Sequence, residues 1–144
     1  NVDASNCPDL FPVISVLAAF CQGTSRLSGV GRLANKESDR AKAIIEMLTQ
    51  MGVQARIEGD VMVIEGHSLA QRLLSHAIPG EVEGSAAPGL LRGGAYTSHH
   101  DHRMVMALKV AELGADSPII IDDEDCVAKS FPQFHDKWSK IERI

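Results

Sequence analysis

The sequence predicts a domain of the α/β class (α+β under some schemes), built from repeated units of helices and strands. Of its 144 residues, 44% are hydrophobic and 23% are charged, which is ordinary for a soluble globular domain. Two stretches have the pattern of helices that are apolar on nearly every side, and short apolar strands follow them. The order of buried helix, strand and second helix occurs twice, which predicts a duplicated architecture.

The first copy begins with an apolar helix over residues 9–22. Pro8 and Pro12 stand near its start, where a missing N–H costs little, and Gly23 follows its end. Residues 24–30 are short and β-leaning, which favours a strand.

A second helix opens at the charged segment KESDR, residues 36–40, and ends at Gly52. Its apolar residues recur at helical spacing: Ala41, Ile44, Ile45, Leu48 and Met51. We therefore expect this helix to bury one stripe only. Residues 53–66 then alternate in two runs about Gly59 and Asp60, which predicts a hairpin.

The second half of the chain has a weaker pattern at first. Residues 66–98 allow a short helix at 69–74 and are otherwise interpreted as a loop or mobile insertion, because residues 79–96 are rich in Gly and Pro. Residues 101–114 predict another helix that is apolar on nearly every side. Residues 117–123 predict a buried strand, and residues 130–141 a final, more polar helix.

These pieces suggest two copies, at about residues 8–65 and 100–144. Asp9 leads the first buried helix and Lys36 follows it by 27 residues, while Lys129 follows Asp101 by 28 residues. The repeat is not strict, because the hairpin and the loop-rich stretch 66–98 lie between the copies.

Composition and charge exclude several classes of protein. The net charge of −5 argues against a general nucleic-acid-binding surface, so any anion site must be local. Three widely spaced cysteines, Cys7, Cys21 and Cys126, suggest neither a disulfide framework nor a zinc knuckle, and a reducing cytoplasm fits best. The apolar runs are too short to cross a bilayer. The abrupt opening on Asn1, without a leader, suggests a fragment of a longer protein.

The charged residues gather where helices are expected to begin. A helix N-terminus offers unpaired N–H groups and a partial positive charge, so Lys36, Arg40, Arg103 and Lys129 would complete a pocket for phosphate or carboxylate. Carboxylates among these bases can exchange protons with a substrate.

Simpler interpretations of both charged motifs stay open at this point. KESDR is also the pattern of a solvated first helical turn. In SHHDHR, Asp101 can be an ordinary N-cap. His99, His100, Asp101 and His102 are all metal-ligand types, but adjacent residues rarely converge on one ion, so we expect no metal.

Four segments in this order resemble the carboxy-terminal motifs of the 5-enolpyruvylshikimate-3-phosphate synthase (3-phosphoshikimate 1-carboxyvinyltransferase) family. They are CPDLFPVISVLAAFCQGTS, KESDR, DHRMVMAL and DCVAKSFPQF. The resemblance implies βαβαββ-type units with buried parallel helices, whose N-termini face a cleft between two domains. These residues would then form about two of the three units of the carboxy-terminal domain, with the amino-terminal domain absent.

The resemblance implies a transferase of the shikimate pathway, in a family known as the target of glyphosate. The enolpyruvyl group of phosphoenolpyruvate would pass to the 5-hydroxyl of shikimate 3-phosphate, and phosphate would leave a tetrahedral intermediate. Asp9 would accept the hydroxyl proton and contact shikimate 3-phosphate, Glu37 would protonate the phosphoenolpyruvate methylene, and Lys36 would contact shikimate 3-phosphate. No cofactor is implied.

The remaining matched positions imply the binding of phosphoenolpyruvate. Arg40, Arg103 and Lys129 would hold its carboxylate and phosphate, and His102 would lie beside them. His100 departs from the family pattern, in which Asn or Gly often precedes DHR. Alone, the fragment is expected to be inactive or slow. The alternatives are a non-catalytic anion-binding or assembly module of the same fold and a metal-dependent hydrolase that uses the His cluster.

Overall fold

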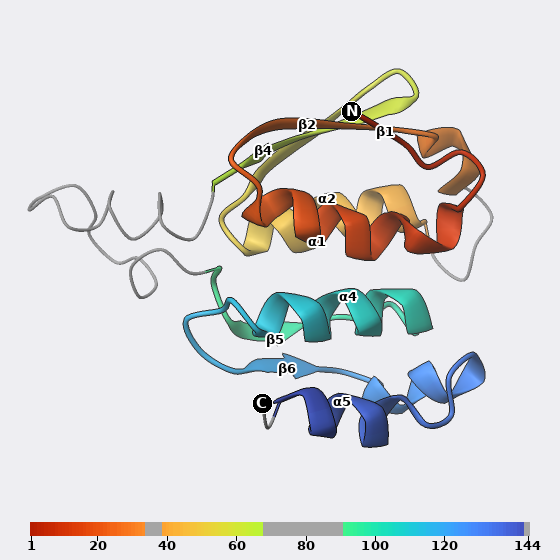
Figure 1. The fold of residues 1–144 in the computed structure, drawn as a ribbon, viewed down its shortest axis with the longest axis vertical. Helices are drawn as coiled ribbons and strands as arrows, with labels where there is room; N and C mark the ends of the chain where they lie inside the picture. The colour runs from red at the N-terminus through yellow and green to blue at the C-terminus, as the bar shows by residue number, and fades with distance from the viewer. Residues whose placement is uncertain (34–38, 68–90, 143–144) are drawn as a thin grey trace, which may run out of the picture.

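The structure, a computed structural model, describes residues 1–33, 39–67 and 91–142. Its elements stack in layers, with a four-stranded sheet on one side and a parallel pair of strands with the last helix on the other (Figure 1). Between these lie three helices: α1 (Phe11–Phe20), α2 (Arg40–Gln50) and α4 (His102–Glu112). The mixed α/β class is therefore confirmed.

The four-stranded sheet has the order β1-β2-β4-β3. Its strands are β1 (Val2–Asp3), β2 (Gly23–Ser28), β3 (Gln54–Glu58) and β4 (Val61–Gly66). β1 pairs parallel with β2, whereas β2 and β3 both pair antiparallel with β4. The expected hairpin is confirmed, since Gly59, with φ of +62°, and Asp60 form the two-residue turn between β3 and β4. Up to β4 the element order is β1, α1, β2, α2, β3, β4, apart from two short 3₁₀ helices.

The three layered helices run in the same direction, and their N-terminal ends lie together on the right of Figure 1. Every residue of α4 is buried or half-buried, as its apolar pattern predicts. The core between these helices and the sheet contains Phe11 of α1, Leu48 of α2 and Ile64 of β4, each fully buried. Burial of one such side chain stabilises the fold by about 1.5–3 kcal/mol. The packing of several such side chains therefore holds the helices side by side, with their N-terminal ends together.

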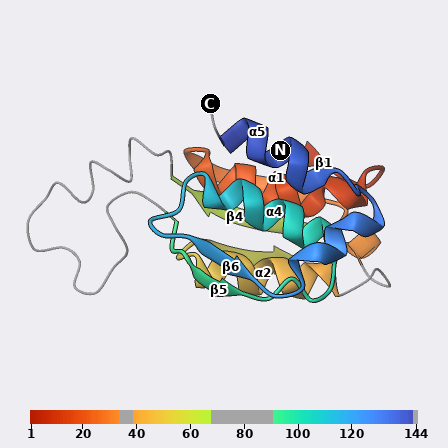
Figure 2. The same ribbon diagram turned by 90° about the horizontal axis from the view of Figure 1, so that it is seen from below.

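The strands β5 (Gly94–Tyr96) and β6 (Ile119–Ile121) form a separate parallel pair. Figure 2 shows this pair on the side of α2, and α5 (Phe134–Glu142) on the side of α1. The amide of Gln50 at the end of α2 donates to the Ala95 carbonyl at 2.7 Å, which ties β5 to the layered helices.

One expectation about a buried segment is wrong. Helix α1 is not buried on every side, because Leu10 just before it is 49% exposed and Leu17 is 60% exposed; no described element covers that face. The stretch 66–98 is interpreted from the sequence as mostly loop, and its described part contains the short strand β5. Residues 68–90, with the short helix expected at 69–74, lie outside the described residues, so that interpretation stays a prediction.

Two expected helix starts are also wrong. Helix α2 begins at Arg40, after Asp39 as its N-cap, so KESDR is not its first turn. Helix α5 begins at Phe134, because residues 124–129 form the 3₁₀ helix η3 (Glu124–Lys129). Lys129 therefore ends a 3₁₀ helix and does not precede the first turn of α5. The division into two of three repeat units of a carboxy-terminal domain stays a prediction.

Candidate functional site

Asp9 lies in a short 3₁₀ helix, η1 (Pro8–Leu10), that leads directly into α1. The segment before it is fixed against the sheet, because the Ala4 amide donates to the Ser28 carbonyl at 3.0 Å. Gly29 allows this approach: its φ is +106°, and a Cβ there would lie 2.7 Å from the Ser5 nitrogen. The Asp9 side chain is held at the N-terminal end of α1 and is 50% exposed.

Arg40 is the first residue of α2, and its side chain is only 1% exposed. Its Nη1 donates to Asp9 Oδ1 at 2.7 Å. Its Nε and Nη2 donate to the two oxygens of Asp101 at 2.7 and 3.2 Å, a bidentate contact. The guanidinium therefore joins the segment before α1 to the segment before α4.

Asp101 is fully buried and is the N-cap of α4. Besides holding Arg40, its Oδ1 accepts the backbone N–H of Arg103 at 3.0 Å. The expected N-cap is thus confirmed, and the same carboxylate is also the partner of a buried cation. Negative charge at this point is favourable, because the positive ends of three parallel helices meet there.

Arg103 and His102 complete this group of side chains at the start of α4. Arg103 Nη2 lies 3.6 Å from Asp9 Oδ2. His102 is 7% exposed. Arg103 Nε and His102 Nδ1 are buried and have no hydrogen-bond partner within the described part of the chain. Buried polar atoms are normally paired, so each of these two nitrogens has a free hydrogen-bonding position for a group outside the described residues.

The structure brings together Asp9, Arg40, Asp101, His102 and Arg103, which we call the helix-end cluster. Lys36 and Glu37 lie outside the described residues. Lys129 is exposed at the end of η3, which packs against α4, and no ion pair is recorded for it among the described residues.

Comparison with known proteins identifies the family. The family model "EPSP synthase (3-phosphoshikimate 1-carboxyvinyltransferase)" matches residues 1–138. The chain belongs to the EPSP synthase family. The 3-phosphoshikimate 1-carboxyvinyltransferase of Clostridium acetobutylicum is 36% identical over 143 residues, and that of Methylobacterium radiotolerans is 39% identical over 137 residues. The expected resemblance is thereby confirmed.

These EPSP synthases are much longer than the chain. The match covers 99% of the chain but 28% of the Clostridium acetobutylicum protein, and 93% of the chain but 26% of the Methylobacterium radiotolerans protein. A solved EPSP synthase structure from Acinetobacter baumannii superposes with a TM-score of 0.72 at 32% identity, over 92% of this chain and 27% of that one. The chain therefore corresponds to a part of an EPSP synthase.

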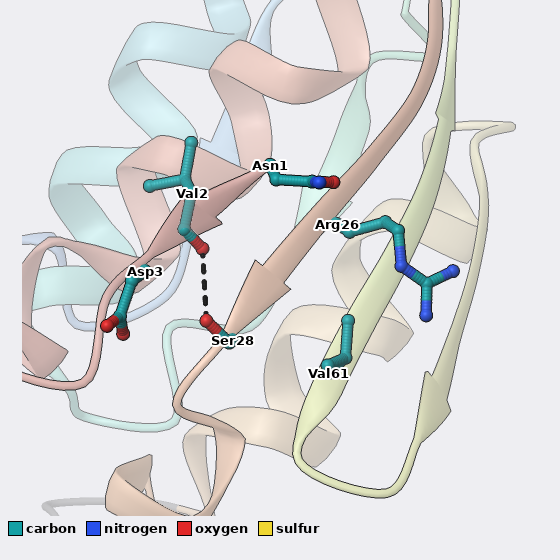
Figure 3. A pocket seen from close by; sticks show the side chains of 6 residues that line it. All are labelled: Asn1, Val2, Asp3, Arg26, Ser28 and Val61. Atoms are coloured by element: carbon teal, nitrogen blue, oxygen red, sulfur yellow. Dashed lines mark hydrogen bonds between the residues drawn. The ribbon is translucent and has the colours of Figure 1, made fainter.

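A pocket within the described residues lies away from this cluster. Figure 3 shows it on the outer face of the four-stranded sheet, between Asn1, Arg26 and Val61. Its volume is about 390 Å³, and no member of the helix-end cluster lines it. The charged side chains of the helix-end cluster therefore lie apart from this pocket.

Residues 1–33, 39–67 and 91–142 lack two kinds of feature. None of the helices there is both long and apolar enough to span a membrane. No group of three or more His, Cys, Asp or Glu side chains there could hold a metal ion. His100 instead places Nδ1 2.6 Å from Asp123 Oδ2.

Sequence reasoning missed Asp101 as the centre of the cluster. Its only signal was the order Asp-His-Arg at a helix start, which also fits an ordinary cap. No pattern in the sequence predicts that Arg40 is buried, because arginine side chains are almost never fully buried unless they are paired.

Proposed function

We propose that the chain is part of an enzyme that transfers the enolpyruvyl group of phosphoenolpyruvate to the 5-hydroxyl of shikimate 3-phosphate. The products would be 5-enolpyruvylshikimate 3-phosphate and phosphate. Membership of the EPSP synthase family supports this reaction. Because the chain spans 28% of the Clostridium acetobutylicum relative, the activity is proposed for the longer protein. The proposed cellular location is the cytoplasm, and the proposed partner is the rest of the same polypeptide.

The observation that carries the proposal is the buried Nε of Arg103, which has no hydrogen-bond partner among the described residues and whose Nη2 lies 3.6 Å from Asp9 Oδ2. His102 Nδ1 is buried in the same way and also has no partner among the described residues. Nitrogens in such a place favour an anion that brings its own oxygen acceptors, as phosphoenolpyruvate does. The N-terminal end of α4 adds a positive potential for the same charge.

Asp9 is proposed as the general base of the transfer. It is half exposed, so a substrate hydroxyl can reach it, and Arg40 holds one of its oxygens at 2.7 Å. Asp9 would accept the proton of the 5-hydroxyl while Glu37 gives a proton to the methylene carbon. The hydroxyl oxygen would then bond to the cationic carbon, and the tetrahedral intermediate would lose phosphate and a methyl proton.

Arg40 is proposed to take part in holding phosphoenolpyruvate. In this structure its side chain is 1% exposed and donates to two carboxylates, so we propose that it also orients Asp9. Arg103 and Lys129 are proposed to bind the carboxylate and phosphate of phosphoenolpyruvate, with His102 beside them. Lys36 is proposed to contact shikimate 3-phosphate. Fixed cations there stabilise the charge that develops in the transition state.

The test is a phosphate-release assay with both substrates, on the chain extended to the length of its relatives. Asp9→Asn and Glu37→Gln are each expected to reduce kcat by about 100-fold or more, the usual contribution of a general base or acid. Asp3→Asn is the matched control, because Asp3 lines the pocket on the outer face of the sheet.

Equal activity in Asp9→Asn and Asp3→Asn would contradict the role of Asp9. An extended chain that binds phosphoenolpyruvate without releasing phosphate would favour the non-catalytic anion-binding module instead.

A further inference from the structure

The loop between β5 and α4, residues 97–101, delivers Asp101 to the helix-end cluster and has an unfavourable backbone. His99 and His100 have φ of 54° and 55°, in the left-handed region that residues other than glycine rarely adopt. Two such residues cost about 1–3 kcal/mol each and persist only where neighbouring contacts hold them. The contacts that hold this loop therefore also determine where Asp101 lies.

Asp122, directly after β6, supplies most of these contacts. Its Oδ1 accepts the backbone N–H of Ser98 at 2.6 Å and the Ser98 hydroxyl at 2.9 Å. Its Oδ2 accepts the Thr97 hydroxyl at 2.8 Å. The Ser98 backbone N–H is the main cause that lowers the pKa of Asp122, with smaller contributions from the two hydroxyls, so the carboxylate is ionised at neutral pH.

Ser98 connects Asp122 to Asp101 through hydrogen bonds. Ser98 is fully buried, its carbonyl accepts the Asp101 N–H at 3.0 Å, and its hydroxyl oxygen lies 3.2 Å from the His100 nitrogen that donates to it. A continuous series of hydrogen bonds therefore runs from Asp122 through Ser98 to Asp101, and on through Arg40 to Asp9.

We propose that Asp122 is a positioning residue for the transfer reaction: through Ser98 it holds Asp101, and through Asp101 it fixes the direction in which Arg40 presents Asp9. This inference rests on the proposed function, because the positioned group is the proposed base. Asp122 acts only through Ser98, Asp101 and Arg40 and does not contact the substrate.

Asp116, at the other end of the same pair of strands, provides a matched control. Its Oδ1 accepts the Gly93 N–H at 2.7 Å and the Ser117 hydroxyl at 2.9 Å, before β5 begins. Asp116 thus braces the same strands by the same kind of contact. Gly93 and Ser117 both lie outside residues 97–101.

The kinetic test compares three variants of the extended chain below their unfolding temperatures. Asp122→Ala is expected to lower kcat by about 10- to 100-fold, because small displacements of catalytic groups have effects of this size. Asp122→Asn keeps an oxygen for the Ser98 N–H and is expected to recover kcat to within about threefold of the parent. Asp116→Ala is expected to keep the parent kcat.

A spectroscopic test on the same protein does not depend on turnover. The Nε–H of Arg40 is buried against Asp101, so its NMR resonance reports their contact. Asp122→Ala is expected to shift this resonance and to speed its exchange with water more than tenfold, whereas Asp116→Ala should change neither.

The two tests separate the two proposals. If Asp122→Ala leaves the Arg40 resonance and kcat as they are in Asp116→Ala, the positioning role is overturned, whatever Asp9→Asn does. If Asp122→Ala moves the resonance while Asp9→Asn keeps full activity, the contact between Asp122 and the Arg40–Asp101 pair is supported, but Asp9 is not the base. That result overturns the proposed role of Asp122 in the reaction.

Discussion

The same residue types form two charged networks in this molecule, and burial makes the two networks different. In the helix-end cluster Arg40 and Asp101 are 1% and 0% exposed. On the four-stranded sheet, Arg26 and Arg56 pair with Glu58 and Glu65 at 3.0–3.4 Å, and these side chains are 33–54% exposed. Water and salt screen the sheet network, whereas each ion of the buried pair depends on its partner.

The lesson of this comparison is that the number of ion pairs does not indicate their importance. A buried pair pays a large desolvation cost, so removal of one partner leaves an unpaired charge, although the intact pair is weak evidence for stability. Such a cluster is better explained by what it positions.

Replacement of Arg40 by Met should have the largest effect. The buried Asp101 carboxylate would lose its bidentate partner, which should lower the free energy of unfolding by about 3–5 kcal/mol. Urea denaturation followed by circular dichroism measures the change. A loss below about 1 kcal/mol would show that Asp101 finds another partner or water.

Replacement of Asp101 by Asn should cost less, about 2–3 kcal/mol, the range of a hydrogen bond to a charged group. Asn is a good N-cap and still offers an oxygen to the Arg103 N–H, so the cap of α4 is kept while the charge opposite Arg40 is lost. Asp101→Ala removes the cap too and should cost about 1 kcal/mol more in the same assay.

The buried, neutral side chain of Tyr96 should also make stability depend on burial, in this case at alkaline pH. Burial raises the pKa of Tyr96 to about 12, whereas an unfolded chain has a tyrosine pKa of about 10. Stability should be unaffected below pH 10 and should fall by about 2 kcal/mol as the pH rises from 10 to 12.

Tyr96 is the only tyrosine, so its ionisation can be followed directly by ultraviolet absorbance. A midpoint near 10 in the folded protein would contradict the raised pKa. Tyr96→Phe should remove this step from the stability profile.

The smallest effect is expected on the sheet surface. Glu58 holds the pKa of Arg56 above its usual value through a hydrogen bond, but both side chains are largely in solvent. Arg56→Gln should therefore leave the urea midpoint unchanged within experimental scatter in 1 M NaCl, with at most a small shift at low salt. A large shift of the urea midpoint that persists at high salt would contradict the claim that the exposed sheet network contributes little to stability.

The sequence predicted those features that depend on local patterns. The helix at 101–114, its Asp101 cap and the turn at Gly59 and Asp60 all follow from hydrophobic spacing and turn chemistry, and all are present. The family followed from four motifs, and residues of three of them, Asp9, Arg40 and Asp101, meet in the helix-end cluster.

The features that it did not predict depend on contacts between distant segments. Strand β5 has three residues and begins with glycine, and only its parallel pairing with β6 makes it a strand. The exposure of Leu17 depends on what covers α1. The contact of Arg40 with Asp101 joins residues 61 positions apart, so no local pattern could reveal it.

The most direct test of the contrast is a double-mutant cycle. Arg40→Met and Asp101→Asn, alone and together, should give a coupling free energy of about 2–3 kcal/mol, while the cycle of Arg56→Gln and Glu65→Gln should give none that can be resolved. A coupling near zero between Arg40 and Asp101, or equal coupling in the two cycles, would contradict the claim that burial separates the two networks.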